Sequence, residues 1–293
     1  MAIPILRRLD RLAALAAGDR PGNRLHNRTE IAYDSSMPSP PPQPLVSNPG
    51  LSSADDSRMK ARQRLIVALD VPDAAAASVL VDRLDDTCAW FKVGLELFVA
   101  AGPVVLEPLL RRGHSIFLDL KFHDIPNTVA GAVRSAASLG VNMLTVHAAG
   151  GPAMLAAARE ALAGVANPPQ LLAVTVLTSM DAAQVTAIGV QRSPAEQVEA
   201  LARMGLEAGI RGFVCSPQET ASLRTLTGPE DVLVIPGIRP AGGAIGDQKR
   251  VATPAEALRA GASYLVVGRP ITQAANPAQA AEAILSEMAG AMG

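Results

Sequence analysis

Cysteine and histidine are scarce in this chain of 293 residues, and each shortage excludes a kind of structural or metal site. The two cysteines, Cys88 and Cys215, lie far apart in the sequence, and two thiols provide neither a disulfide framework nor the spacing of a metal site. The four histidines form no H-x-x-x-H or comparable pair. We therefore predict no metal site, and we expect the chain to reside in a reducing cytoplasm.

The sequence also lacks a charge excess, a long apolar run and a dinucleotide motif. Its formal net charge is −1, so the composition does not point to nucleic acid or to an anionic membrane. No apolar run after residue 60 reaches the uninterrupted length that a membrane-spanning helix needs. No G-x-G-x-x-G follows an expected strand, which argues against a dinucleotide-binding fold. The hydrophobic content of 49% is sufficient for a large buried core.

The first 60 residues differ in composition from the remainder. Residues 34–57 are rich in Ser, Pro and Asn, and such a segment cannot build a core. Arg7, Arg8 and Asp10 interrupt the apolar stretch that a signal peptide requires. A transit peptide fits the first 30 residues loosely, and a misassigned start codon explains them as well. We expect a disordered or low-complexity extension over residues 1–60 and one domain over residues 61–293.

From residue 64 onward, apolar strand-like runs alternate with helical segments about eight times. The runs are almost continuously apolar, as in parallel sheets that are buried on both faces. A polar loop is expected over residues 178–193, before a helix that begins at Pro194. This alternation predicts an α/β protein, a single-domain (β/α)8 TIM barrel. The expected strands cover residues 64–70, 90–94, 115–121, 142–147, 171–177, 212–216, 232–235 and 264–270.

Residues 115–128 combine a buried strand, a charged tip and the start of a helix. At period two, Phe117, Asp119 and Lys121 share one face, so a carboxylate and an ammonium point the same way. Asp124 adds a second carboxylate just before Pro126, which suits the first turn of a helix. Such charges are costly to desolvate unless they neutralise one another, and barrels place their chemistry at strand ends of this kind. We predict that this stretch is the active site.

A plainer interpretation of the same residues stays open. Asp124 is also suited to cap the helix, and Asp119 with Lys121 to form an ordinary ion pair. The rarity of lysine favours the active site, because only four of the 26 basic residues are lysines. Lysine differs from arginine in being a compact charge that can give up a proton.

The predicted barrel brings the carboxyl ends of all strands to one rim. Asp70, Lys92, Ser179 and Arg239 follow or end expected strands, so we expect them to converge with the central motif. A phosphate often binds after strands seven and eight of such barrels, where residues 268–269, Gly-Arg, offer close backbone approach and a charged fork. A plain turn with a surface arginine is the alternative there. The glycine-rich residues 241–250 are expected to form a closing lid.

The order of these motifs resembles that of the orotidine 5'-phosphate decarboxylases of short bacterial type. The matching motifs occupy residues 69–70, 91–94, 119–128, 236–239, 246–250 and 267–272. The resemblance therefore extends from about residue 64 to the C-terminus. It implies a cofactor-free and metal-free decarboxylation of orotidine 5'-monophosphate to UMP and CO2, the last step of de novo UMP synthesis. It also implies a homodimer with shared active sites.

The resemblance further implies a role for each matching residue. Lys121 would stabilise the carbanion at C6 of the pyrimidine and protonate it, with Asp119 beside it. Asp124 and Thr128 would reach across the dimer interface, and Lys92 would join the catalytic charge network. The implied substrate-binding residues are Asp70 and Lys92 at the ribose, Ser179 at the pyrimidine edge, Gln248, Gly268 and Arg269 at the phosphate, and Arg239 at the rim.

Two other functions stay open. A Mg2+-dependent sugar-phosphate decarboxylase or aldolase of the same suprafamily shares the barrel and an Asp-x-Lys-x-x-Asp motif. Such relatives lack the full continuation found here over residues 122–128. A non-catalytic nucleotide-binding module would bind UMP without turnover, and the intact Asp119, Lys121 and Asp124 argue against it.

Overall fold

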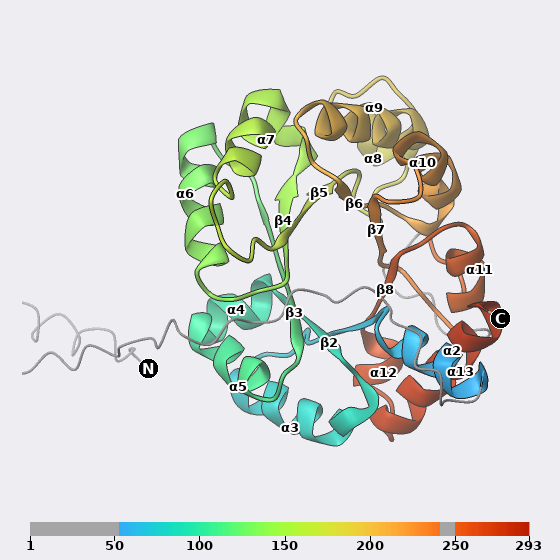
Figure 1. The fold of residues 1–293 in the computed structure, drawn as a ribbon. Helices are drawn as coiled ribbons and strands as arrows, with labels where there is room; N and C mark the ends of the chain where they lie inside the picture. The colour runs from blue at the N-terminus through green and yellow to red at the C-terminus, as the bar shows by residue number, and fades with distance from the viewer. Residues whose placement is uncertain (1–52, 241–249, 293) are drawn as a thin grey trace, which may run out of the picture. The chain divides into compact units, whose positions relative to one another are not determined.

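Eight parallel strands form a closed barrel in sequence order, with β8 paired to β1 (Figure 1). The structure is a computed structural model that describes residues 53–240 and 250–292. The predicted (β/α)8 barrel is therefore confirmed. The strands are β1 (Leu65–Ala68), β2 (Trp90–Gly94), β3 (Ser115–Phe122), β4 (Met143–His147), β5 (Gln170–Val174), β6 (Gly212–Val214), β7 (Val232–Ile235) and β8 (Tyr264–Val267).

Helices form a ring around the strands (Figure 1). Proline in the first turn starts several of them, where its missing N–H has no partner to lose. The helices described are α2 (Ser53–Arg62), α3 (Ala74–Leu84), α4 (Leu95–Ala101), α5 (Leu106–Arg111), α6 (Pro126–Ala137), α7 (Gly151–Glu160), α8 (Ala182–Ala187), α9 (Pro194–Glu207), α10 (Thr220–Thr227), α11 (Pro254–Arg259), α12 (Arg269–Thr272) and α13 (Pro277–Met292).

Helix α8 lies within the segment that the sequence predicts to be a polar loop. Asp181 accepts a hydrogen bond from the backbone N–H of Gln184, and the Gln184 side chain accepts one in return. This capping box stabilises a short helix that has only one fully buried apolar residue, Val185. The weak apolar pattern of the segment explains why the helix was not predicted.

Side chains of the strands alternate between two hydrophobic layers. Ile66, Phe117 and Met143 belong to a small cluster that fills the barrel. Leu65 and Val67 belong to the larger cluster between the strands and the helices. Burial on both faces accounts for the near-continuous apolar character of the strands.

The pairing of β3 with β4 changes register where the charged residues begin. Leu118 pairs with Leu144, and the next pair joins Phe122 to Val146, so four steps along β3 match two along β4. An irregularity of this kind re-aims side chains and is common next to active sites. Asp119 and Lys121 lie in this shifted segment.

Helix α2 crosses the boundary that we expect at residue 60. Its Arg58 donates two hydrogen bonds of 2.7 Å to the Glu282 carboxylate of α13, and its Ala61 is fully buried. Residues 53–60 therefore pack onto the barrel, whereas residues 1–52 lie outside the described part of the chain. The division into domains stays a prediction.

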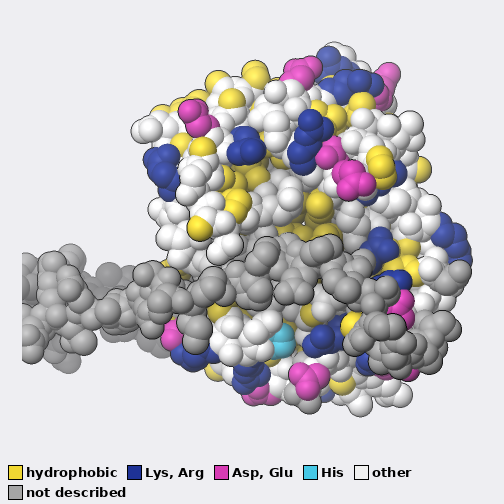
Figure 2. Space-filling model, in the orientation of Figure 1, with side chains coloured by type: hydrophobic (Ala, Val, Ile, Leu, Met, Phe, Trp, Pro, Cys, Tyr) yellow, Lys and Arg dark blue, Asp and Glu magenta, His cyan; other side chains and the backbone are white. Residues whose placement is uncertain are grey.

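The surface of the described residues carries charges of both signs. In Figure 2, acidic and basic side chains are interspersed on the face shown. Within the described ranges, the search for a helix long and apolar enough to cross a membrane found none.

Candidate active site

Four charged side chains form a chain at the carboxyl ends of β1, β2 and β3. Lys92 Nζ lies 2.9 Å from Asp70 Oδ1 and 3.6 Å from Asp119 Oδ2. Lys121 Nζ lies 2.9 Å and 2.8 Å from the two oxygens of Asp119. The signs alternate along Asp70, Lys92, Asp119 and Lys121, which we call the charge chain. The structure thus brings together four of the residues predicted for the site.

Glycine at the end of β2 makes room for this arrangement. A Cβ atom on Gly94 would lie 2.8 Å from Lys92 Nζ and 3.3 Å from Asp70 Oδ1. The first distance is shorter than real Cβ contacts, so a side chain there would displace the Lys92 ammonium. Gly94 therefore leaves room for Lys92 to bridge two carboxylates, that of Asp70 after β1 and that of Asp119 on β3, the two strands that flank β2.

Burial decreases from the middle of the charge chain to its ends. The side chains of Lys92 and Asp119 are each 11% exposed, whereas those of Lys121 and Asp70 are 31% and 57% exposed. Burial disfavours the charge on Asp119, but the charges of Lys92 and Lys121 outweigh it and hold the pKa of Asp119 below its usual range. Burial likewise opposes the charge on Lys92, but Asp119 and Asp70 outweigh it and raise the pKa of Lys92.

The backbone of Lys121 adopts a left-handed conformation, with φ of 49°. This is the one positive φ of a residue other than glycine in the described ranges. Such a conformation costs a residue with a side chain about 1–2 kcal/mol and is found mainly at functional sites. The Lys121 N–H donates a 2.9 Å hydrogen bond to the hydroxyl of Thr145 on β4, and this hydroxyl donates a 3.0 Å hydrogen bond to Asp119 Oδ1.

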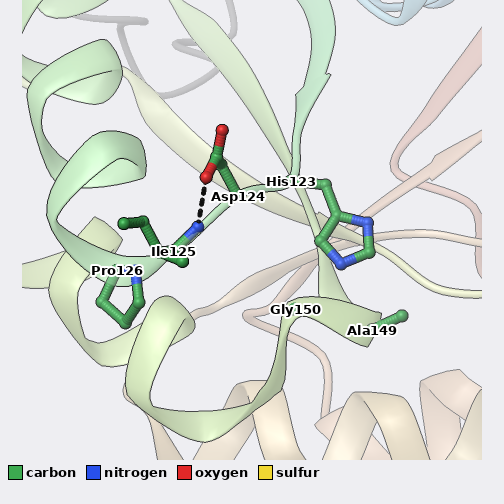
Figure 3. A pocket seen from close by; sticks show the side chains of 6 residues that line it. All are labelled: His123, Asp124, Ile125, Pro126, Ala149 and Gly150. Carbon is green, nitrogen blue, oxygen red and sulfur yellow. Dashed lines mark hydrogen bonds between the residues drawn. The ribbon is translucent and has the colours of Figure 1, made fainter.

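Asp124 and Thr128 are exposed at the start of α6. The Asp124 carboxylate accepts a 2.6 Å hydrogen bond from the N–H of Ile125, as Figure 3 shows. Ile125 is the N-cap of α6, and no side chain caps that helix, so Asp124 is not the cap that the plainer interpretation requires. Among the ion pairs of the described residues, none joins Asp124 to the charge chain.

An open pocket lies beside Asp124, between the connections that follow β3 and β4 (Figure 3). His123 borders it, and its ring stacks on His147 with a centroid distance of 5.4 Å and an interplanar angle of 19°. Burial, followed by the nearby His123 and Lys121, lowers the pKa of His147. The pocket is lined by His123, Asp124, Ile125, Pro126, Ala149 and Gly150.

Two arginines gather at the ends of β7 and β8. Arg239 is buried, and burial together with the charge of Arg269 lowers the pKa of Arg239. A Cβ on Gly268 would lie 3.7 Å from Ala68 Cβ and 3.8 Å from Asp70 Oδ2, so this glycine abuts the end of β1. Two neighbouring guanidinium groups suit a dianion such as a phosphate.

Within the described ranges, Ser179 forms no hydrogen bond with the charge chain. Ser179 is exposed on the turn after β5, which a 2.9 Å hydrogen bond from Met180 N–H to the Leu177 carbonyl closes. Gln248 and the expected lid lie within residues 241–249, outside the described residues.

Known proteins resemble this chain over all eight strands. Residues 63–284 match the sequence model of the Orotidine 5'-phosphate decarboxylase / HUMPS family. The orotidine 5'-phosphate decarboxylase of Moorella thermoacetica is 56% identical over 79% of this chain and 94% of its own. The enzyme of the same name from Halorhodospira halophila is 54% identical over 78% of this chain and 97% of its own. A crystal structure of orotidine 5'-phosphate decarboxylase from Lactobacillus acidophilus covers 77% of this chain and 98% of that chain, at 41% identity and a TM-score of 0.68.

The chain belongs to the Orotidine 5'-phosphate decarboxylase / HUMPS family. The matched residues run from just before β1 into α13 and include every residue predicted for the site. The family resemblance drawn from the sequence motifs is therefore confirmed.

Two features of this family member were not predicted from its sequence. In the sequence, Thr145 resembles any other residue of a buried strand, and only its hydrogen bond with Lys121 distinguishes it.

Arg250 is the second such feature. It forms a buried ion pair with Glu219, whose other oxygen accepts a hydrogen bond from the Ser216 hydroxyl. Arg250 also donates a 2.9 Å hydrogen bond to the Leu177 carbonyl, so it connects the loops that follow β5, β6 and β7. Arg250 belongs to the matching motif over residues 246–250, and this membership was the one sequence feature that could have indicated its role.

Proposed function

We propose that this chain catalyses the decarboxylation of orotidine 5'-monophosphate to UMP and CO2, the last step of de novo UMP synthesis. The charge chain is the observation that carries the proposal. An ammonium held between strand ends by buried carboxylates suits a reaction that develops negative charge on carbon. Relatives of 56% and 54% identity that bear the name orotidine 5'-phosphate decarboxylase support it.

Lys121 supplies the chemistry in this proposal. Loss of CO2 breaks the bond from C6 to the carboxylate carbon and leaves its electron pair on C6. The Lys121 ammonium stabilises that carbanion and then donates a proton to C6, which yields UMP. Its 2.8 Å contact with Asp119 fixes its position, while its 31% exposed side chain stays within reach of a substrate. No cofactor enters this sequence of steps.

The remaining residues hold the substrate in place. Asp70 and Lys92 bind the ribose hydroxyls, and Ser179 binds the edge of the pyrimidine. Arg239, Gln248, Gly268 and Arg269 bind the phosphate. The phosphate lies far from C6, but the energy of binding it lowers the activation barrier of decarboxylation where that energy is realised only in the transition state.

A homodimer completes the site in this proposal, with Asp124 and Thr128 reaching into the partner subunit's active site. The exposed Asp124 is consistent with this role. So are large apolar side chains exposed on and after α4 and at the start of α6, since such patches mark contacts between subunits. These exposed side chains are Leu95 at 53%, Val99 at 79%, Val104 at 64% and Ile125 at 67%.

Hybrid dimers test the shared site. Subunits carrying Asp124→Ala, mixed with subunits carrying Lys121→Ala, should regain activity that neither variant has alone. Random mixing makes about half of the dimers hybrid with one intact site each, so roughly a quarter of wild-type activity is expected. Mixtures as inactive as their parents would rule out a site built from two subunits.

The proposal also includes a cytoplasmic location and an N-terminal extension, over about residues 1–60, that takes no part in catalysis. The family match begins at residue 63, which supports that division.

The decisive test follows the ultraviolet absorbance of orotidine 5'-monophosphate with purified protein, with and without EDTA. Turnover that EDTA leaves unchanged is the expected result. Turnover abolished by EDTA, or restricted to hexulose phosphates, would indicate the Mg2+-dependent sugar-phosphate enzymes instead. Binding of UMP without any turnover would indicate a nucleotide-binding module.

A further inference from the structure

Thr145 makes two contacts that ordinary strand geometry does not require. It lies on β4 with its side chain toward the barrel interior, two residues after Met143, and it is fully buried. Its hydroxyl accepts from the Lys121 N–H at 2.9 Å and donates to Asp119 Oδ1 at 3.0 Å. One oxygen atom therefore joins the backbone of Lys121 to the carboxylate that holds the Lys121 ammonium.

The register shift explains why a side chain is needed here. Backbone pairs between β3 and β4 stop at Leu118 and resume at Phe122, so the ladder with β4 does not fix the intervening residues. On the other side of β3, the last pair with β2 joins Asp119 to Gly94, so it does not reach Lys121. Lys121 lies there in a left-handed conformation that is unfavourable for a residue with a side chain. The Thr145 hydroxyl replaces the missing ladder bond and gives the Lys121 N–H a partner in the interior.

Thr175 shows how a buried threonine of this barrel is satisfied without such a role. Thr175 is also fully buried, and it lies directly after the last residue of β5, beside the end of β6. Its hydroxyl donates a 2.9 Å hydrogen bond to the backbone carbonyl of Val214. Thr145 instead bonds to a carboxylate and an N–H of the charge chain, so burial alone does not explain its contacts.

We propose that Thr145 is a positioning residue, whose hydroxyl fixes the Asp119 carboxylate and the Lys121 backbone so that the Lys121 ammonium faces the substrate. This inference rests on the proposed decarboxylase activity. Thr145 itself does not touch the reacting atoms. Its loss should therefore lower kcat through misplacement of Lys121 and leave substrate binding at the phosphate intact.

Three variants test the proposal by kcat and KM for orotidine 5'-monophosphate. Thr145→Val keeps the shape of the side chain and removes the hydroxyl, and kcat should fall on the order of 100-fold with little change in KM. Thr145→Ser keeps the hydroxyl and should restore most of the rate. Thr175→Val is the matched control and should stay close to wild type. Thr145→Ala repeats the comparison if Thr145→Val does not fold.

A second readout does not depend on activity. The 13C signal of the Asp119 carboxyl, identified by its absence in Asp119→Asn, reports the protonation of Asp119 as the pH is lowered. Removing a hydrogen bond to the charged form should move this titration to higher pH in Thr145→Val, but not in Thr145→Ser or Thr175→Val. Lys92 and Lys121, the other groups that face Asp119, stay unchanged in all three variants.

Several outcomes would overturn the proposal. Thr145→Val with the rate and the Asp119 titration of the wild type would show that the hydroxyl positions nothing. Thr145→Ser as slow as Thr145→Val would show that the hydroxyl does not restore the rate, and the hydroxyl would then not be what positions Lys121. A wild type that does not decarboxylate orotidine 5'-monophosphate would end the proposed function, and the Asp119 titration would then decide on Thr145 by itself.

Discussion

Two networks of opposite charges lie near the carboxyl ends of the barrel strands, and they differ in how far their end groups are exposed to solvent. The charge chain ends in Lys121 and Asp70, whose side chains are 31% and 57% exposed. The ion pair of Glu219 and Arg250 is closed, with side chains 5% and 7% exposed. Its remaining contacts go to protein atoms, among them the Ser216 hydroxyl and the Leu177 carbonyl.

The residue types match these two environments. Arginine in the closed pair uses its fork of donors to connect a carboxylate with backbone carbonyls. Lysine in the charge chain is a compact charge that can release a proton, and its exposed end leaves access for a ligand. Burial alone therefore does not distinguish the proposed active site from the closed pair. The charge chain differs because its buried middle holds an end group that a ligand can reach.

The largest effect is expected from Lys121→Ala, which removes the reachable ammonium. Turnover of orotidine 5'-monophosphate should fall by roughly 10^4-fold or more, because the carbanion loses both its stabilising charge and its proton donor. The melting temperature should change little, since the side chain is partly exposed.

Lys60→Ala is the matched control for that experiment, because Lys60 forms an exposed ion pair with Asp56 on α2. Its rate should equal that of the wild type. A loss of less than about tenfold in Lys121→Ala would contradict a role in general acid catalysis.

Breaking the closed pair should affect stability first. Arg250→Ala leaves Glu219 buried without its partner, and we expect a loss of about 3–5 kcal/mol in the free energy of unfolding. Urea denaturation measures this difference. Arg203→Ala removes an exposed pair with Glu199 and should cost no more than about 1 kcal/mol. Equal costs in the two variants would refute the distinction between closed and exposed pairs.

The charge chain should also set limits to stability at both ends of the pH scale. The pKa of Asp119 is lowered, so its stabilising contribution is complete above the ordinary carboxyl pKa of about 4 and is lost as pH falls through the lowered value. The pKa of Lys92 is raised, so its contribution is complete below the ordinary lysine pKa of about 10.4 and is lost as pH rises through the raised value.

The measurement compares urea unfolding of the wild type and Asp119→Asn across the pH scale. Their difference in unfolding free energy should be constant from about pH 5 to pH 9 and should shrink in acid below about pH 4. A difference that grows as the pH falls would have the wrong sign for a carboxylate with a lowered pKa.

The smallest effects are expected from shortening the N-terminus. A chain that begins at Ser53 keeps α2 and should retain the activity and stability of the full chain. A chain that begins at Gln63 loses the Arg58 contact with Glu282 and the buried Ala61, and it should be less stable by on the order of 1 kcal/mol. Thermal unfolding and the decarboxylation rate of both chains check this. A large loss of rate in the chain that begins at Ser53 would assign residues 1–52 to the enzyme.

Sequence patterns predicted the strands better than their ends. The fifth expected strand covers residues 171–177, whereas β5 is Gln170–Val174. Thr175 and Val176 are still buried, so the apolar pattern continues after the ladder has ended. The eighth expected strand also runs past Val267, into residues that begin α12. Hydrophobic pattern reports burial, and burial continues where chain segments leave the sheet.

The sequence by itself determined the barrel, the family and the kinds of charged group at each strand end. These follow from local patterns and from the order of motifs along the chain. Only the tertiary structure decided that Asp70, Lys92, Asp119 and Lys121 form one chain of alternating charges. It also decided that Thr145 holds the backbone of Lys121, because that contact depends on a register shift between two strands. Register, burial and partner choice arise from contacts between distant residues, which no local pattern specifies.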